Sequence, residues 1–297
     1  MKIGLIDMGS NTIRLCVYEA ENGRFERTYD QKIMAKLGSC VECGELTREG
    51  IGRAVDAVSE LRRAYTEHLD VLQAFATASL RNVTNGGEAA AYIESETGLP
   101  IRLISGEEEA LLSMEGARLG GAMPPSGCMI DIGGGSTELA VYEDGEAQTV
   151  LSLPIGSLNL RKDRVIGERP TAGEGRVLAG IVSEHLPRLE GLPACPVMVG
   201  VGGTVRTAVK VANLVLETGD GKMLTRSDAS GLLALLLKGD EAAVIAVEQA
   251  APDRSRTLPT GLMILTTIME TLKAEQVRAS KYGVREGFLS KHFLNQS

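Results

Sequence analysis

The chain carries the same pattern of strand, polar turn and strand at two places far apart in its sequence. Residues 5–23 read LIDMGSNTIRLCVYEAENG, and residues 129–146 read MIDIGGGSTELAVYEDGE. Aligned without a gap, the two stretches match at Asp7 and Asp131, at Gly9 and Gly133, at Thr12 and Ser136, and at the Val-Tyr-Glu of 17–19 and 141–143. A register that pairs Asp, Gly and Tyr-Glu as well as apolar positions indicates an internal repeat. Its long period is typical of two half-molecules of related fold.

The second copy contains three consecutive glycines, Gly133, Gly134 and Gly135, followed by Ser136 and Thr137. Successive backbone N–H groups in such a turn form a concave anion site, since no Cβ blocks close approach. The two hydroxyl side chains add donors. A tight hairpin with polar turn residues is the structural alternative, but a hairpin needs only one or two glycines. The pattern is neither a P-loop nor a dinucleotide-binding fingerprint.

The first copy supplies a second polar turn, in which Ser10, Asn11 and Thr12 are the candidate donors. We therefore expect a phosphate-binding cleft between the two turns. Asp131 ends its strand beside the glycines, and a carboxylate there suits Mg²⁺ better than it suits a phosphate.

Composition narrows the classes of partner. The net charge is −8 and tryptophan is absent, which disfavours general binding to DNA or to a membrane surface. The sequence has no run of 18 apolar residues and its start lacks a leader cleavage site, so we expect neither a membrane span nor a signal peptide. Five cysteines, an odd number, suggest reduced thiols in the cytoplasm. Cys40 and Cys43 form a C-x-x-C in an expected loop, and their role is left open.

Strand and helix patterns alternate, which predicts an α/β fold. Expected strands cover 2–8, 13–19, 101–105 and 196–201, and the segment 71–79 is expected to be a strand followed by a turn. Expected helices cover 47–69, 86–97, 106–121 and 173–190, with further helical stretches after the GVGGT turn to the end of the sequence. The Gly- and Pro-rich segment 120–127 predicts a boundary between domains 1–122 and 123–297.

The segment ISGEEEALL places three carboxylates at the start of an expected helix. Ser105 and Glu108 have the spacing of a capping box, and acidic residues also favour the helix dipole. These roles explain Glu107 and Glu108 and leave Glu109 least explained. If the helix begins at Gly106, Glu109 faces differently from its neighbours and could act as a general base.

Two further stretches carry candidate ligands. Arg81 follows a buried strand in ATASLRN and is either a phosphate ligand or a surface residue. The stretch GVGGT opens a helix, where Gly203 and Thr204 could hold another phosphate or a ribose. Arg206 and Lys210 follow, as ligand contacts or as solvated side chains.

The motifs IDMGSNTIRL, ATASLRN, ISGEEEALL, DIGGGSTEL, SLPIGSLNL, GVGGT and YGVREGFL occur in one order from residue 3 to about 290. Together they resemble the exopolyphosphatase and guanosine pentaphosphate phosphohydrolase (Ppx/GppA) family. The resemblance implies an α/β fold of two actin-like, ribonuclease-H-like (ASKHA) domains with the active site in the cleft between them. It implies that a last helix, about 286–297, packs back on the first domain, and that the protein is a homodimer.

The resemblance also assigns roles to residues. It implies that Glu109 is the catalytic base, that Asp131 holds Mg²⁺ or Mn²⁺, and that Glu138 is a second acidic residue of the catalytic site. The motif arginine falls on Arg81. Phosphate-loop positions fall on Asn11, Gly134, Gly135, Ser136 and Thr137.

The expected function is hydrolysis of the terminal phosphoryl group of polyphosphate or of the 5′ γ-phosphate of pppGpp, with the metal held by Asp131 together with Glu138 and Asp7. The choice between these ligands stays open. The chain resembles the short, two-domain members, without the HD-type extension, which favours short polyphosphate or pppGpp. Two alternatives remain: an ATP-dependent kinase on the same fold, and a sensor that binds guanosine penta- or tetraphosphate or polyphosphate without hydrolysis.

Overall fold

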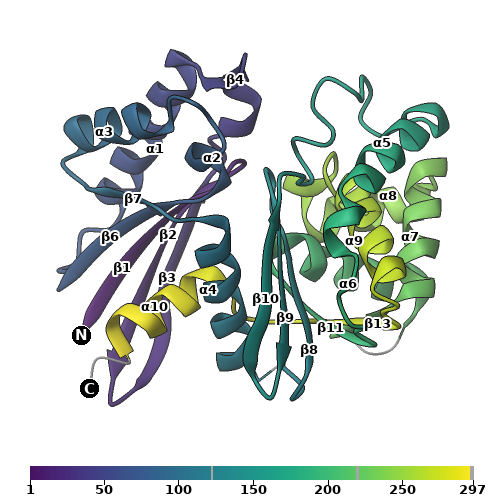
Figure 1. The fold of residues 1–297 in the computed structure, drawn as a ribbon. Helices are drawn as coiled ribbons and strands as arrows, with labels where there is room; N and C mark the ends of the chain where they lie inside the picture. Colours follow the sequence, from purple (N-terminus) through teal and green to yellow (C-terminus); the bar gives the residue numbers. More distant parts are fainter. Residues whose placement is uncertain (122, 219–220, 295–297) are drawn as a thin grey trace. The chain divides into compact units, whose positions relative to one another are not determined.

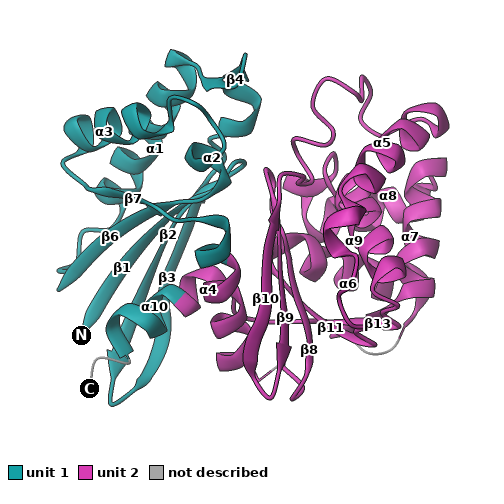
Figure 2. Cartoon of the chain, viewed as in Figure 1, with its two compact units in different colours: residues 1–109, 288–297 teal, residues 110–287 magenta. Residues whose placement is uncertain are grey.

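The structure is a computed structural model that describes residues 1–121, 123–218 and 221–294. The chain forms two compact units (Figure 2). Unit 1 comprises Met1–Glu109 and the residues from Phe288 onward, and unit 2 comprises Ala110–Gly287. The boundary that the sequence predicts falls on residue 122, outside the described residues. The two compact units divide inside helix α4, Gly106–Leu119.

Unit 1 follows the predicted alternation of strands and helices. Its elements are β1 Lys2–Met8, β2 Ile13–Glu21, β3 Arg24–Ile33, the 3₁₀ turn Leu37–Cys40, β4 Val41–Glu42, β5 Glu45–Leu46, α1 Arg48–Ala64, β6 Val71–Ala76, α2 Ala78–Arg81, α3 Gly86–Thr97, β7 Ile101–Leu103 and the start of α4. The main sheet has the order β3-β2-β1-β6-β7, with β1, β6 and β7 parallel.

Helices α1 and α3 cover one face of this sheet (Figure 1). The predicted apolar stripe of α1 lies in this core, where Ala54, Val58 and Leu61 are buried. Phe75 of β6 stacks on Phe288, and the two ring centroids lie 4.8 Å apart. The end of helix α10, Val284–Leu289, therefore packs on unit 1 through an aromatic contact.

Unit 2 is the larger of the two. Its elements are the rest of α4, β8 Gly127–Ile132, β9 Thr137–Glu143, β10 Glu146–Leu153, α5 Ala172–Glu184, β11 Val197–Val201, α6 Gly202–Leu216, β12 Met223–Thr225, α7 Arg226–Lys238, α8 Glu241–Ala250, α9 Leu258–Thr271, β13 Gln276–Ala279 and the start of α10, with 3₁₀ turns at Leu186–Leu189 and Pro252–Arg254. The sheet order is β10-β9-β8-β11-β13-β12.

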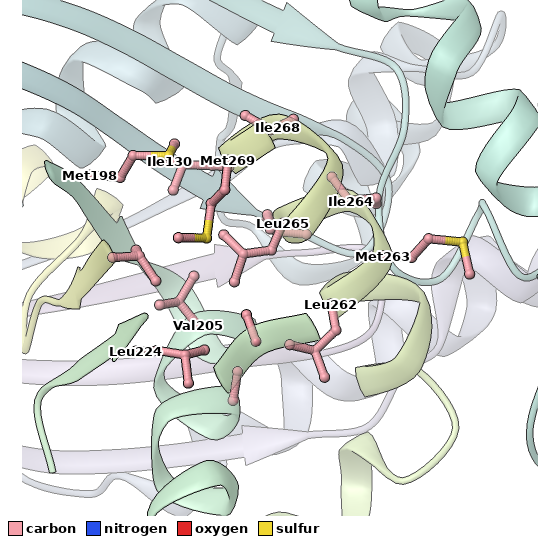
Figure 3. Close-up of a cluster of buried hydrophobic side chains, with 14 of the residues drawn as sticks. Ile130, Met198, Val205, Leu224, Leu262, Met263, Ile264, Leu265, Ile268 and Met269 are labelled. Atoms are coloured by element: carbon pink, nitrogen blue, oxygen red, sulfur yellow. The ribbon is translucent and has the colours of Figure 1, made fainter. Parts of the chain in front are cut away.

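Both faces of the unit 2 sheet are covered. On one face helices α5 to α9 form an aliphatic core with alternate strand residues, and Ile130 and Met198 share this core with Leu262 and Ile268 of α9 (Figure 3). On the other face Ala110, Met114 and Ala117 of α4 pack on Met129, Ala140 and Val201. This accounts for the nearly continuous burial of β8 and β9, since both sides of a central strand are removed from water.

The internal repeat is visible in the backbone. Asp7 pairs with Arg14 across the β1–β2 hairpin, and Asp131 pairs with Glu138 across the β8–β9 hairpin, at matching positions of the repeat. With the strands of each sheet numbered in chain order, the unit 1 sheet runs 3-2-1-4-5 and the unit 2 sheet runs 3-2-1-4-6-5, so both share the order 3-2-1-4. The sequence prediction of two ribonuclease-H-like halves is confirmed at the level of strand order.

Six of the described strands were not expected from the sequence: the short strands β4, β5, β12 and β13, of which the last two interrupt a stretch expected to be helical, and the longer strands β3 and β10. The polar segment after residue 20 forms β3, and residues 146–153 form β10, and both are the outer strands of their sheets. An edge strand is exposed over much of its length and needs no run of apolar residues, so a hydrophobic pattern does not reveal it. Helix α5 also ends at Glu184, before the predicted end at 190, and a 3₁₀ turn follows.

Local sequence signals mark the helix starts. The side-chain oxygens of Thr47, Thr171, Thr225 and Asp240 accept hydrogen bonds from the first turns of α1, α5, α7 and α8.

Among the residues that the structure describes, no helix combines the length and hydropathy that a membrane span requires.

Within unit 2, α4 closely approaches Gly283 and helix α10 through glycines. A Cβ placed on Gly116 would lie 2.0 Å from the carbonyl oxygen of Gly283, and one on Gly287 would lie 1.8 Å from that of Leu112. No side chain fits at these backbone contacts.

Gly116→Ala is therefore expected to lower the free energy of unfolding by about 1–3 kcal/mol, as overpacking does in other proteins. The control is Gly180→Ala on the exposed side of α5, where an added Cβ meets nothing within 4 Å. That variant is expected to gain about 0.4–1 kcal/mol, because alanine reduces the freedom of the unfolded chain. Urea unfolding measures both, and an equal effect of the two substitutions would contradict the packing described.

Candidate active site

The glycine turn of unit 2 is held from one side by a single segment. Residues 154–159, PIGSLN, are the buttress of this turn. The amide of Ser157 donates to the Gly133 carbonyl at 2.9 Å, and the amides of Leu158 and Asn159 donate to that of Gly134 at 2.9 and 3.0 Å. The Asn159 side chain donates to the Gly135 carbonyl at 2.9 Å. All three glycine carbonyls thus point toward the buttress.

The direction of the amides follows from these carbonyls. In a trans peptide the N–H group points opposite to the preceding carbonyl, and the described peptide bonds include no cis form. The amides of Gly134, Gly135 and Ser136 therefore point away from the buttress. Three amides on one side of a turn without large side chains form a concave site suited to an anion.

The turn of unit 1 has the same construction. The Gly9 amide donates to the Thr12 carbonyl at 3.0 Å, just as the Gly133 amide donates to that of Ser136 at 3.0 Å. The amides of Gly38 and Lys36 donate to the carbonyls of Ser10 and Asn11 at 2.8 and 2.9 Å. The amides of Asn11 and Thr12 consequently point away from residues 36–38.

Arg81 and Glu109 meet within unit 1. The Arg81 Nη1 atom lies 2.6 Å from Oε2 of Glu109 and donates to the Ile104 carbonyl at 3.2 Å. Glu109 is only 8% exposed. Helix α2, which ends at Arg81, is tied to the end of β1 because Ser79 donates to the Met8 carbonyl. The base candidate and the arginine candidate therefore lie at the same edge of the sheet as the turn.

The first turn of α4 shows why Glu109 differs from its neighbours. Helix α4 begins at Gly106, as expected, and the Glu108 amide donates to Ser105 Oγ at 3.0 Å. The Glu108 carboxylate accepts from Arg102 at 2.6 Å on the surface, and Glu107 is exposed. Of the three consecutive carboxylates, Glu109 is the one turned inward.

Asp131 is a buried carboxylate at the end of β8. It is 9% exposed and accepts from Ser113 Oγ of α4 at 3.1 Å. Burial raises the pKa of Asp131 above its usual value, against the opposing effects of the Ser113 hydrogen bond and of Arg206, Arg285 and Arg254. Desolvation of the charged form is the larger effect.

The GVGGT stretch lies against the same carboxylate. Gly202 has φ of +74°, and a Cβ there would lie 2.4 Å from Oδ1 of Asp131. Thr204 Oγ1 donates to the Ile132 carbonyl at 2.8 Å, which ties the start of α6 to the end of β8. The glycine turn, Asp131 and the N-terminus of α6 thus meet at the carboxyl ends of β8 and β11, the edge where α/β sheets bind ligands.

Three arginines surround this part of unit 2. The guanidinium of Arg254 lies over Gly203, where a Cβ would be 2.0 Å from its Nη2 atom. Burial, and next the charge of Arg285, lower the pKa of Arg206 to about 10. Arg206 also donates to the Ser280 carbonyl at 3.3 Å, whereas Lys210 is exposed and donates to that of Ala250. Arg206, Arg254 and Arg285 thus set a positive field around Asp131.

The remaining candidates have structural partners. Glu138 is 0% exposed and accepts from Ser152 Oγ at 2.9 Å, and Thr137 donates to the Ile155 carbonyl at 2.6 Å. Asp7 lies half-buried near the end of β1, in unit 1, whereas Asp131 and Glu138 lie in unit 2. Ser10 and Ser136 are both buried.

The match to a protein-family model decides the relationship. The model described as the Ppx/GppA phosphatase family matches residues 16–296. The chain belongs to the Ppx/GppA phosphatase family. The family that the motifs resembled is therefore confirmed, and so is the actin-like fold class.

Ppx/GppA relatives of known name match over nearly the whole chain. Exopolyphosphatase 1 of Mycobacterium tuberculosis is 24% identical over 304 residues, which cover 97% of this chain and 87% of the relative. Guanosine-5′-triphosphate,3′-diphosphate pyrophosphatase of Vibrio vulnificus is 28% identical over 293 residues. That match covers 95% of this chain but 57% of the Vibrio protein.

Solved structures of Ppx/GppA proteins share the fold. An exopolyphosphatase from Cytophaga hutchinsonii is 22% identical with a TM-score of 0.86, over 98% of this chain and 97% of the other. A Ppx/GppA phosphatase from Aquifex aeolicus is 23% identical with a TM-score of 0.73, over 99% of each chain.

Several residues of this Ppx/GppA site were missed by sequence reasoning. Ser113, Asn159, Arg254 and Arg285 reach it from segments distant along the chain. Arg285 stands in the motif YGVREGFL and Asn159 in SLPIGSLNL, two motifs whose residues carry no predicted role of their own. A polar residue in a helix or loop carries no signal of which turn it contacts.

A metal ion is compatible with the donors present. Among the described residues no group of three or more His, Cys, Asp or Glu side chains gathers as a metal cage. Mg²⁺ needs no such cage, since it usually binds through one or two carboxylates, substrate phosphates and water. Asp131, beside an anion-binding turn, fits that pattern.

Proposed function

We propose that the chain hydrolyses the terminal phosphoanhydride bond of inorganic polyphosphate or the bond to the 5′ γ-phosphate of pppGpp. The observation that carries this proposal is the pair of matched turns whose carbonyls are tied down and whose amides point away. The relatives support the substrate class, since one is an exopolyphosphatase and another a guanosine pentaphosphate pyrophosphatase by name. Both ligands end in a chain of phosphates.

The proposed binding mode uses both units. The amides of residues 134–136 in unit 2 and of residues 11–12 in unit 1 are the donors that we propose for the terminal phosphates. Arg81 would add a guanidinium contact, and the backbone at Gly203 and Thr204 would hold a phosphate further along the chain. The field of Arg206, Arg254 and Arg285 favours an anion there, since charge stabilisation in a partly dry site is stronger than in water.

The proposed reaction is an in-line displacement by water. The water oxygen attacks the terminal phosphorus while the Glu109 carboxylate accepts a proton from that water. The bond between the terminal phosphorus and the bridging oxygen breaks. The bridging oxygen leaves with the shortened chain, and the terminal group departs as orthophosphate. The turn amides stabilise the charge on the transferred group, which is the main demand of phosphoryl transfer.

Asp131 is the residue that would hold a divalent cation, with Glu138 and Asp7 as further predicted ligands. A bound Mg²⁺ or Mn²⁺ would neutralise charge on the phosphate oxygens. Asp131 lies next to the glycine turn, so its carboxylate can serve that role without a cage of protein ligands.

A side-by-side assay tests the proposal. Orthophosphate release is measured on tripolyphosphate, long-chain polyphosphate, pppGpp and ATP, with and without Mg²⁺ and with no acceptor present. We expect release from polyphosphate or pppGpp that depends on the metal. Transfer of phosphate only to an added acceptor would establish a kinase instead. Tight metal-dependent binding without release over hours would establish a sensor, and either result overturns the proposal.

The setting in the cell is part of the proposal. All five cysteines are free thiols, and Cys40 is buried while Cys43 is exposed. We propose a cytoplasmic enzyme that functions as a homodimer of two-domain chains.

A further inference from the structure

Asn159 makes a compact set of hydrogen bonds behind the glycine turn. Its Oδ1 atom accepts from the Gly156 amide at 2.7 Å. Its Nδ2 atom donates to the carbonyls of Gly135 and Pro154, at 2.9 and 3.1 Å. The side chain is half-buried, and all of these partners lie within unit 2. One short side chain therefore joins the last glycine of the turn to both ends of the loop that supports it.

The contact with Gly135 fixes one peptide plane of the turn. The Gly135 carbonyl and the Ser136 amide belong to the same planar group, so holding the oxygen sets the direction of the N–H. The other two glycine carbonyls are held by backbone amides of the buttress. The Ser136 amide is thus the member of the anion site whose direction depends on a side chain.

The backbone of the buttress is in close contact with the glycine turn, so that the orientation of the Ser136 amide is held rigidly. A Cβ on Gly156 would be 2.5 Å from the carbonyl carbon of Gly134 and 2.6 Å from the amide nitrogen of Gly135. Gly156 in turn donates to Asn159. The turn therefore rests directly on the backbone that Asn159 organises.

The hydrogen-bond pattern requires an amide side chain. The position needs an acceptor for the Gly156 amide and a donor that reaches two carbonyl oxygens, and asparagine offers both on one short stem. Aspartate has the same size but, when ionised, only accepts. It would place a negative oxygen against the carbonyls of Gly135 and Pro154, which repels both.

We propose that Asn159 is a positioning residue that aims the Ser136 amide at the phosphoryl group being transferred. The inference rests on the proposed function. Loss of this orientation of the Ser136 amide is expected to lower kcat more than it raises KM. The reason is that a donor matched to the transition state stabilises the transition state more than the bound substrate. The size expected is roughly 10²-fold in kcat, the effect of removing or displacing one such donor.

The test compares Asn159→Asp with Asn22→Asp, which adds the same charge at the exposed tip of the β2–β3 hairpin. Hydrolysis of tripolyphosphate gives kcat and KM, thermal unfolding gives stability, and ¹H–¹⁵N spectra report the Ser136 amide. We expect Asn159→Asp to lose roughly 10²-fold in kcat and to shift the Ser136 signal. We expect Asn22→Asp to match the wild type in both.

A second variant distinguishes the loss of the side-chain hydrogen bonds from misfolding. Asn159→Ala removes the side-chain bonds without adding charge, while the backbone bonds of Leu158 and Asn159 to Gly134 remain. It is expected to fold and to show the same loss in kcat. Wild-type kcat together with an unmoved Ser136 signal in either folded variant would overturn the inference. A wild-type protein without hydrolytic activity would overturn the proposed function instead, and the Ser136 signal would still report on Asn159.

Discussion

Glu109→Gln is expected to lower the turnover number by roughly 10²–10⁴-fold, because the attacking water loses the group that accepts its proton. Binding of tripolyphosphate should stay near the wild-type level. The reason is that the amide oxygen of glutamine can still accept the hydrogen bond from Arg81, which lies 2.6 Å from the carboxylate. Steady-state kinetics and calorimetric titration with tripolyphosphate measure the two properties separately.

Glu107→Gln is the matched control, since Glu107 lies in the same helical turn but is exposed. It should keep full activity. Near-wild-type turnover in Glu109→Gln would remove Glu109 from the mechanism. An equal loss in both variants would show that the charge of the helix start, and not proton transfer, is what matters.

Asp131→Asn is expected to lower the activity while it raises the stability of the protein. Loss of the carboxylate that would hold the metal removes several kcal/mol of charge stabilisation, which corresponds to roughly 10²–10³-fold in kcat/KM. The apparent Mg²⁺ requirement should also rise. Stability should change in the opposite direction, since burial disfavours the charged form of Asp131 and raises its pKa above 3.8.

The effect of Asp131→Asn on the free energy of unfolding is expected to depend on pH. A carboxyl whose pKa is raised on folding stabilises the native state below its unfolded pKa and loses that contribution as pH rises through the folded value. Asparagine imitates the neutral form at every pH. The unfolding free energy of Asp131→Asn minus that of the wild type should therefore increase from about pH 4 upward.

Urea unfolding at several pH values measures this difference. Asp144→Asn, at the exposed β9–β10 turn, is the control and should show no such trend. A variant that becomes less stable than the wild type as pH rises would mean that the charged Asp131 is needed to balance Arg206, Arg254 and Arg285. Full activity in the variant would remove Asp131 from the site.

What the sequence predicted correctly is encoded locally. The two hairpins could be aligned because Asp, Gly and the apolar alternation recur in one register. The start of α4 followed from Ser105 and Gly106, and the distinct direction of Glu109 followed from that start. These features depend on neighbours within a few residues, where hydrogen-bond and packing rules act directly on the sequence.

The parts that could not be predicted depend on contacts between distant segments. Nothing in SLPIGSLNL says that Asn159 reaches Gly135, and nothing near Arg254 says that its guanidinium covers Gly203. The same holds for Ser113 and Asp131, which α4 and β8 bring together. Such pairs follow from sheet order and helix packing, which a polar residue in its own segment does not report.

The most direct test of the central claim is a crystal structure of Glu109→Gln with tripolyphosphate and Mg²⁺. We expect terminal phosphate oxygens within about 2.7–3.2 Å of the amide nitrogens of Gly134 to Ser136, together with contacts from Asn11 or Thr12. We also expect residue 109 to face the terminal phosphorus. A phosphate chain bound away from both turns, or a residue 109 that points away from it, would contradict the account.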